Sequence, residues 1–296
     1  MVVGHTCGQP LYNWIYSFHM PLFFIVSGLF FSPNKYTPVI FLKRRFKQLV
    51  VPLLIFTTFV ICIYSVFIPE RNVLSNLELG VLPGALWFLY VMFLLQTLYF
   101  FLVSLVKSNK FLLLIVVFIS MFIGTSIRIN SANILYIGTI FSSLPFYALA
   151  HLLSAEIRKL NQQQIGTLKL SIYGFICLLF PLIVVLYTGK SISLWDNVIP
   201  SPIILYYITA CIGSIGIIFL SKAIINKRKY AIVLTFLGKN TLPIVALNQL
   251  IIDLSVKYLN CPSHVCFKVM QQLFVWSLCL LTIKFCNRYF RIAIGK

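Results

Sequence analysis

Long apolar segments recur along the whole chain, separated by short polar connections. We place nine of them at residues 12–31, 49–68, 86–106, 111–127, 132–153, 168–187, 202–221, 241–259 and 265–285. Each is close to the roughly 20 apolar residues that a helix needs to cross a bilayer. The strands of a membrane β-barrel would show alternating segments of about ten residues instead. Because helices satisfy their own backbone in lipid, the pattern predicts an all-α, polytopic membrane helix bundle with nine full spans.

Composition supports the same class of protein. Hydrophobic residues make up 60% of the chain and charged residues 10%, whereas soluble domains carry about 25% charged residues. The polar connections are too short to fold by themselves. We therefore expect residues 1–296 to form a single integral-membrane domain.

The net charge of +19 is compatible with nucleic-acid binding, but the distribution of the charges argues against it. Of the 24 Lys and Arg residues, 19 lie in the alternate connections 32–48, 107–110, 154–169 and 222–240 and in the tail from residue 284. This is the positive-inside pattern of a membrane protein. It predicts a cytoplasmic C-terminus, an outer loop at 188–201 and no nucleic-acid partner. The bilayer itself is the expected partner.

The first residues, MVVGHT, read as the last part of a hydrophobic helix. Nine spans and a cytoplasmic C-terminus place the N-terminus outside, whereas an even number of spans would place both ends in the cytoplasm. We therefore expect a truncated first span that ends here, in a domain that is N-terminally incomplete and would have ten spans when whole.

Few polar residues interrupt the predicted spans. His19 lies within 12–31, and Asn248 and Asp253 lie within 241–259. Ionisable groups inside a membrane are costly and usually functional. His19 is a candidate acid or base because its unperturbed pKa is near 6.5, but it also suits a neutral hydrogen bond between helices. Asp253 lies near the end of its segment, where it can simply meet water.

A basic cluster precedes the second predicted span. Lys43, Arg44 and Arg45 stand together in the stretch FLKRRFKQLVVPLL. Arg binds phosphate through two parallel hydrogen bonds, so the cluster suits a phosphate-binding patch. It also suits a plain positive-inside anchor. The spacing of Cys and His residues fits no metal site, and no metal is predicted.

Four stretches, in order along the chain, resemble the integral-membrane acyltransferase-3 family. They resemble most closely its fucose O-acetylase-like branch of sugar O-acetyltransferases. The stretches are GHTCGQPLYNWIYSFHMPLFFIVSGLFF at residues 4–31, the basic segment at 43–52, LWFLYVMF at 86–93 and FLGKNTLPI at 236–244. The resemblance implies a ten-helix bundle with both ends in the cytoplasm. It also implies transfer of an acetyl group from acetyl-CoA, a donor substrate rather than a bound cofactor, to a hydroxyl of a surface glycan or its lipid-linked precursor. The implied location is a bacterial inner membrane.

The resemblance also assigns roles to individual residues. His5 matches the catalytic histidine of the family, although its basic partner would precede Met1. Gln48 stands where the family has a second arginine, and Asn248 where many relatives have a histidine. We therefore expect His5 to be the general base, and His19 to support it.

The remaining candidates bind the substrates. Lys43, Arg44 and Arg45 are expected to hold the CoA phosphates. Trp14, Trp87 and Asn248 are expected to contact the acceptor sugar. For each tryptophan the alternative is an aromatic anchor at the membrane interface.

Two other functions compete with the enzyme. A transporter or flippase for lipid-linked sugars would also need many spans and a basic patch. Against it, Asp253 is the one acidic residue within a predicted span, and the sequence shows no inverted repeat. A catalytically inactive, truncated acyltransferase is the second alternative.

Overall fold

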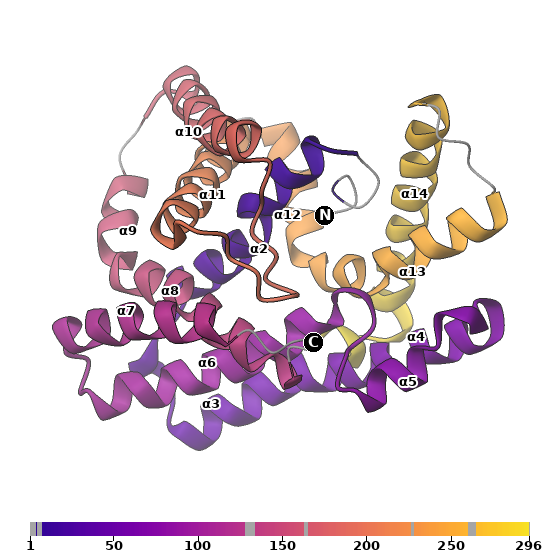
Figure 1. The fold of residues 1–296 in the computed structure, drawn as a ribbon, viewed down its shortest axis with the longest axis horizontal. Coiled ribbons are helices and arrows are strands. Elements are labelled where there is room, and N and C mark those ends of the chain that lie inside the picture. Colours follow the sequence, from indigo (N-terminus) through magenta and orange to yellow (C-terminus); the bar gives the residue numbers. More distant parts are fainter. Residues whose placement is uncertain are drawn as a thin grey trace. The chain divides into compact units, whose positions relative to one another are not determined.

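The computed structural model describes residues 4, 8–127, 134–162, 165–225, 228–259 and 265–295. These residues are helical along most of their length (Figure 1). Within the described ranges, extended backbone pairs at one bridge, between Ser193 and Val198. The predicted all-α class is confirmed.

Each of the nine predicted spans contains a helix, but these helices differ in length. Five are long and apolar enough to cross a membrane, namely Pro38–Phe67, Gly84–Leu105, Thr167–Thr188, Ile203–Ile225 and Lys268–Tyr289. A bent pair, Tyr230–Lys239 and Thr241–Tyr258, adds a sixth if it forms one span. Two further apolar helices are shorter, Lys110–Ser126 and Ile137–Leu152. The chain is thus an integral membrane protein with several spans, and the count of nine stays a prediction.

The helices form two compact units, which we describe separately. Unit 2 comprises residues 8–35 and 95–236. Its helices are α2 (Leu11–Leu29), the second part of α6 (Trp87–Leu105), α7 (Lys110–Ser126), α8 (Ile137–Leu152), α9 (Ser154–Gln162), α10 (Thr167–Thr188), α11 (Ile203–Ile225) and most of α12 (Arg228–Lys239). A short 3₁₀ turn, η1 (Pro33–Lys35), follows α2, and another, η5 (Ile134–Tyr136), precedes α8. Helix α2 packs on both α8 and α11, and α10 packs along α11.

Small residues allow these helices to pack closely. Gly28 of α2 lies against the backbone carbonyl of Tyr147 in α8, where a Cβ atom would collide. A Cβ atom on Gly213 of α11 would come within 2.8 Å of the ring of Phe18. Helices in lipid gain little from the hydrophobic effect, so close van der Waals contact of this kind is a main source of their association. The glycines therefore fix α2 against its two neighbours.

Unit 1 comprises the described residues within the ranges 1–7, 36–94 and 237–296. Its helices are α3 (Pro38–Arg45), the π-helical turn η2 (Phe46–Val50), α4 (Val51–Phe67), η3 (Pro69–Arg71), α5 (Val73–Glu78), η4 (Gly84–Leu86), the first part of α6, α13 (Thr241–Leu259), α14 (Val265–Tyr289) and η6 (Ile292–Ile294). Helices α13 and α14 pack together, and α4 contacts α13 and η6.

The basic cluster of unit 1 is helical, not a loop ahead of a span. Residues Pro38–Phe67 form one continuous helix. Pro38 starts α3, where its missing N–H costs nothing. Pro52 follows the π-helical turn and cannot donate a backbone hydrogen bond. The wider turn accommodates that defect without ending the helix, which is why the predicted connection 32–48 is largely helical.

The predicted connection 222–240 also contains a helix, α12. The chain bends by 74° between α12 and α13. Asn240 is buried at the bend and accepts a hydrogen bond from Asn287 Nδ2 of α14 at 2.6 Å. This side-chain pair ties the bend to the last helix of the unit.

Candidate functional site

Helix α2 carries His19 in a stripe of aromatic side chains. Tyr12, Tyr16, His19 and Phe23 are spaced by three and four residues, which places them on one helix face. Ring centroids are 4.3 Å apart for the first pair, 6.0 Å for the second and 5.4 Å for the third. We call these four residues the aromatic stripe. His19 as a whole is partly buried, and both of its ring nitrogens are buried.

The adjoining face of α2 is used for packing. Trp14 Nε1 donates a hydrogen bond to the Leu178 carbonyl of α10 at 3.1 Å, and its ring meets Phe18 edge-on. Asn13 Nδ2 donates to the Gly189 carbonyl at 2.9 Å. The rings next to His19 are thus those of Tyr16 and Phe23, and the predicted contact of Trp14 with a sugar stays a prediction.

His5 lies outside the described residues. Its predicted role as general base, and its relation to His19, therefore stay predictions.

A second histidine of unit 2 was not singled out from the sequence. His151 stands in the last turn of α8, and its Nδ1 atom is 2.8 Å from the hydroxyl of Tyr99. Phe31 packs edge-on against the imidazole at 5.0 Å between centroids. The hydroxyl and the rings hold the imidazole in one orientation. The sequence signal that could have identified His151 is a histidine at the end of an apolar segment, next to a basic connection.

The basic cluster of unit 1 is partly engaged by neighbouring side chains. Lys43 and Arg44 are exposed, and the Arg44 guanidinium lies 4.6 Å from the ring centroid of Tyr36. Arg45 lies over Phe41 and donates a hydrogen bond to Gln48 Oε1 at 3.2 Å. Gln48 thus orients the Arg45 guanidinium.

The C-terminal turn closes against this segment. Gly295 has a positive φ of 70°, and a Cβ atom at this position would come within 3.2 Å of the Gln48 backbone. Gly295 is therefore suited both to the left-handed turn and to the close approach. The contact fixes the backbone beneath the basic cluster.

Two further predicted site residues of unit 1 are buried. Trp87 lies at the start of α6 and is almost inaccessible. Asn248 of α13 is 0% exposed, and neither its Oδ1 nor its Nδ2 atom has a hydrogen-bond partner within the described ranges. Burying an amide without a partner is costly, so this side chain is suited to pairing with a polar ligand.

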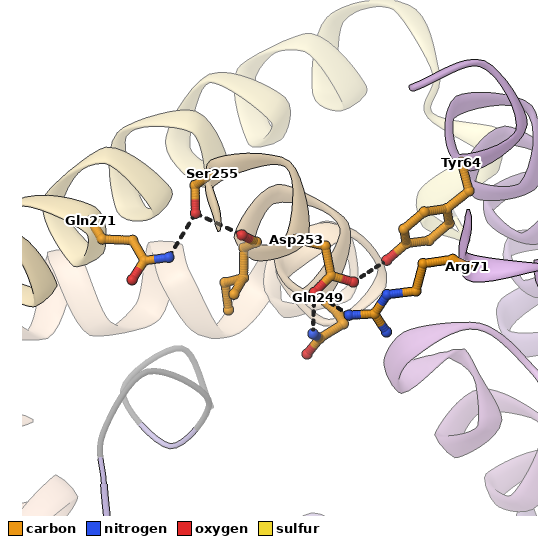
Figure 2. Close-up of polar contacts among 7 residues, drawn as sticks. Tyr64, Arg71, Gln249, Asp253, Ser255 and Gln271 are labelled. Atoms are coloured by element: carbon orange, nitrogen blue, oxygen red, sulfur yellow. Dashed lines mark hydrogen bonds and ion pairs between the residues drawn. The ribbon is translucent and has the colours of Figure 1, made fainter. Parts of the chain in front are cut away.

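Asp253 is the centre of a polar network on α13 (Figure 2). Its carboxylate accepts hydrogen bonds from Tyr64 Oη at 2.6 Å, Arg71 Nη2 at 2.8 Å and Gln249 Nε2 at 3.0 Å. The sequence suggested that Asp253 meets water, and this was wrong. Its side chain is 8% exposed because these donors replace water around the charge.

Neighbouring polar groups of unit 1 are paired as well. Gln271 Nε2 donates to Ser255 Oγ at 2.8 Å, joining α14 to α13 (Figure 2). Lys257 Nζ donates to both carboxylate oxygens of Glu70 and to the Phe67 carbonyl. A backbone hydrogen bond at Glu70 itself, together with the Lys257 ammonium, holds the pKa of the Glu70 carboxyl below its usual value. Asn248 differs from these groups because its amide has no partner among the described residues.

The predicted site residues fall in both units. His19 and Trp14 belong to unit 2, whereas the basic cluster, Trp87 and Asn248 belong to unit 1. Among the described residues, no group of three His, Cys, Asp or Glu side chains is arranged to hold a metal ion.

Comparison with protein families identifies a family for most of the chain. The family model described as "Acyltransferase domain", the third family of that name, matches residues 1–286. Comparisons with curated proteins and with solved structures gave no significant match.

Proposed function

Because the chain belongs to the acyltransferase-3 family, it is a membrane acyltransferase, and we propose that it acetylates a sugar. The donor is acetyl-CoA. The acceptor is a hydroxyl group of a cell-surface glycan or of its lipid-linked precursor. The proposed location is a bacterial plasma membrane, with the C-terminus in the cytoplasm.

The aromatic stripe of α2 is the observation that carries this proposal. Aromatic rings offer flat apolar faces with polar edges nearby, and such faces suit the apolar side of a sugar ring. Tyr12 at the end of the stripe is exposed, and His19 stands between Tyr16 and Phe23 further along. A sugar bound along the stripe would place a hydroxyl near the His19 imidazole.

The reaction needs a base for that hydroxyl. In our proposal His5 takes the proton as the hydroxyl oxygen attacks the thioester carbonyl, and His19 supports the alignment. The tetrahedral intermediate collapses, the carbon–sulfur bond breaks, and CoA leaves as the thiolate, which regains a proton. General base assistance of this kind contributes typically 10²–10⁴-fold in rate.

The basic cluster suits the donor. Lys43 and Arg44 present exposed charges, and Arg45 is already oriented by Gln48. Phosphates of acetyl-CoA would pair with these cations on the side of the membrane where the donor is made. Asn248, whose amide has no partner among the described residues, would bind the acceptor.

The structure gives no support to an ion-coupled transporter. Such a protein needs an intramembrane acid that exchanges an ion or proton. Asp253, the one acid in a predicted span, is held by three donors.

Purified protein in lipid nanodiscs provides the test. Radiolabelled acetyl-CoA is supplied with methyl glycosides as soluble acceptors, and acetyl ester and free CoA should form in equal amounts. Tyr16→Leu should raise the acceptor KM while the acetyl-CoA KM is unchanged. Tyr173→Leu, an exposed tyrosine on α10 of the same unit, is the matched control and should change neither. Binding of acetyl-CoA without any ester or thiol product would overturn the proposal.

A further inference from the structure

Arg71 is held in place by a buried carboxylate but keeps most of its hydrogen-bonding capacity. Its side chain is 52% exposed, whereas that of Asp253 is 8% exposed. The bond between them uses the Nη2 atom of the guanidinium. Figure 2 shows the guanidinium beside the carboxylate, with one dashed line joining the two groups. Because half of the side chain is exposed and its contact with Asp253 uses Nη2 alone, guanidinium donors are left for a ligand.

Another surface cation of unit 1, Lys257, pairs in a different way from Arg71. The Lys257 ammonium donates to three oxygens, two from Glu70 and one from the Phe67 backbone. Its donors are therefore used up by the protein. If Arg71 served only to neutralise Asp253, we would expect the fork of the guanidinium to lie across both carboxylate oxygens. Tyr64 instead occupies the second oxygen.

Gln249 adds a hydrogen-bond acceptor beside this cation. An ionised carboxylate only accepts hydrogen bonds, so the amide nitrogen of Gln249 must face Asp253 and its Oε1 atom must face away. The Gly84 turn, with φ of 57°, lies against the Gln249 Cβ atom. The Gln249 side chain is thus fixed at both ends and presents a carbonyl oxygen next to the Arg71 guanidinium.

We propose that Arg71 and Gln249 form a subsite for the acyl acceptor, binding an anionic group, carboxylate or phosphate, and an adjacent hydroxyl. Asp253 is the positioning residue, because it holds both side chains. The guanidinium fork matches either anion, and its fixed orientation reduces the entropy lost on binding. This inference rests on the proposed function and narrows its acceptor to acidic sugars or sugar phosphates.

The sequence places this subsite on the side of the membrane opposite to the donor. Arg71 is one of five Lys and Arg residues assigned to the outer side by the positive-inside pattern. An acceptor that arrives from outside, or on a lipid carrier, would meet the exposed edge of the guanidinium.

The test compares three acceptors in the nanodisc assay. Methyl α-glucoside is neutral, methyl α-glucuronide carries a carboxylate, and glucose 1-phosphate carries a phosphate. The native chain should show kcat/KM about 10- to 100-fold higher for at least one anionic acceptor than for the neutral one, as expected for a hydrogen bond to a charged group. Preference for the glucuronide identifies an acidic sugar, and preference for the phosphate identifies a sugar phosphate. The preference should fall with rising salt, since Arg71 is half exposed.

Variants separate recognition from structure. Arg71→Gln should bring the anionic-to-neutral ratio of kcat/KM close to one, and Lys257→Gln, the matched control, should leave the ratio unchanged. Removing Arg71 alone leaves a buried charge with fewer partners, so the double change Arg71→Gln with Asp253→Asn provides a second variant with a neutral network. It should show the same loss of preference.

The outcomes distinguish this subsite from the proposed function. Equal transfer to all three acceptors by the native chain would overturn the subsite and keep the acetyltransferase. A preference that survives in the double variant would also overturn it. No transfer to any acceptor, despite acetyl-CoA binding, would overturn the proposed function itself.

Discussion

Replacing Asn248 with leucine should make the protein more stable and less active. The amide is 0% exposed and unpaired within the described ranges. A buried polar group without a partner costs about 1–3 kcal/mol. Leucine has a similar size and no polar atoms, so Asn248→Leu should recover about that amount in the free energy of unfolding.

The cost to function follows from the same amide. If Asn248 pairs with the acceptor, its loss removes a hydrogen bond that forms only with substrate. A loss of about 1–3 kcal/mol in transition-state binding corresponds to a fall of roughly 5- to 150-fold in kcat/KM for the acceptor. The KM for acetyl-CoA should not change.

Gln271→Leu is the matched control, because Gln271 is a buried amide with a partner. Its Nε2 atom donates to Ser255 Oγ at 2.8 Å. Losing that bond should lower stability by about 0.5–1.5 kcal/mol. Intrinsic tryptophan fluorescence during heating in nanodiscs gives the melting temperature of both variants, and the acetyl-transfer assay gives their activity.

We expect the melting temperature to rise in Asn248→Leu and to fall in Gln271→Leu. If Asn248→Leu lowers the melting temperature as Gln271→Leu does, while acceptor kinetics stay native, the side chain has a structural role. The reasoning from the unpaired amide would then be refuted.

Three further predictions concern the donor, the base and pH. Changing Arg44 and Arg45 to Gln should raise the KM for acetyl-CoA, with each lost phosphate contact costing about 1.5–3 kcal/mol; an unchanged KM would leave these residues as topology anchors. His5→Ala should lower kcat by about 10²–10⁴ and His19→Ala by less, and the reverse ranking in single-turnover rates would move the base to His19. The pKa of the Glu70 carboxyl is lower in the folded protein than in the unfolded chain, so the ion pair stabilises the protein above the unfolded-state pKa, and this stabilisation is lost as pH falls through the folded-state pKa. The melting temperature of the native chain should therefore decline slightly on the acid side, and Glu70→Gln should remove this decline. A Glu70→Gln variant with the native melting temperature at every pH would contradict the prediction.

The positions of the long helices could be predicted from the sequence. Apolar runs of about 20 residues have few other solutions in a membrane, and each predicted span does contain a helix. The helical parts of the connections were missed. Helix α12 and the continuous helix Pro38–Phe67 include clusters of basic residues. Because charged segments were assigned to the connections between spans, these helices were not predicted from the sequence.

The Asp253 network could not be predicted for a different reason. Arg71 and Asp253 are 182 residues apart in sequence, and no local pattern links them. Hydropathy alone placed Asp253 near water, since it lies toward the end of its segment. Only the packing of α4 and η3 against α13 brings Tyr64 and Arg71 to it, beside Gln249 of the same helix. His151 was missed similarly, because its partner Tyr99 is on another helix.

The two faces of α2 explain why the candidate aromatic residues near the histidine were also missed. Both faces are apolar in sequence, so hydropathy cannot tell a packing face from a binding face. In the structure Trp14 and Phe18 are turned to α10 and α11, whereas Tyr16 and His19 lie together on the aromatic stripe. A tryptophan is the usual first choice for sugar stacking, yet the indole N–H of Trp14 is already bonded to the Leu178 carbonyl. The tyrosines of the stripe are therefore the better candidates for holding a sugar beside His19.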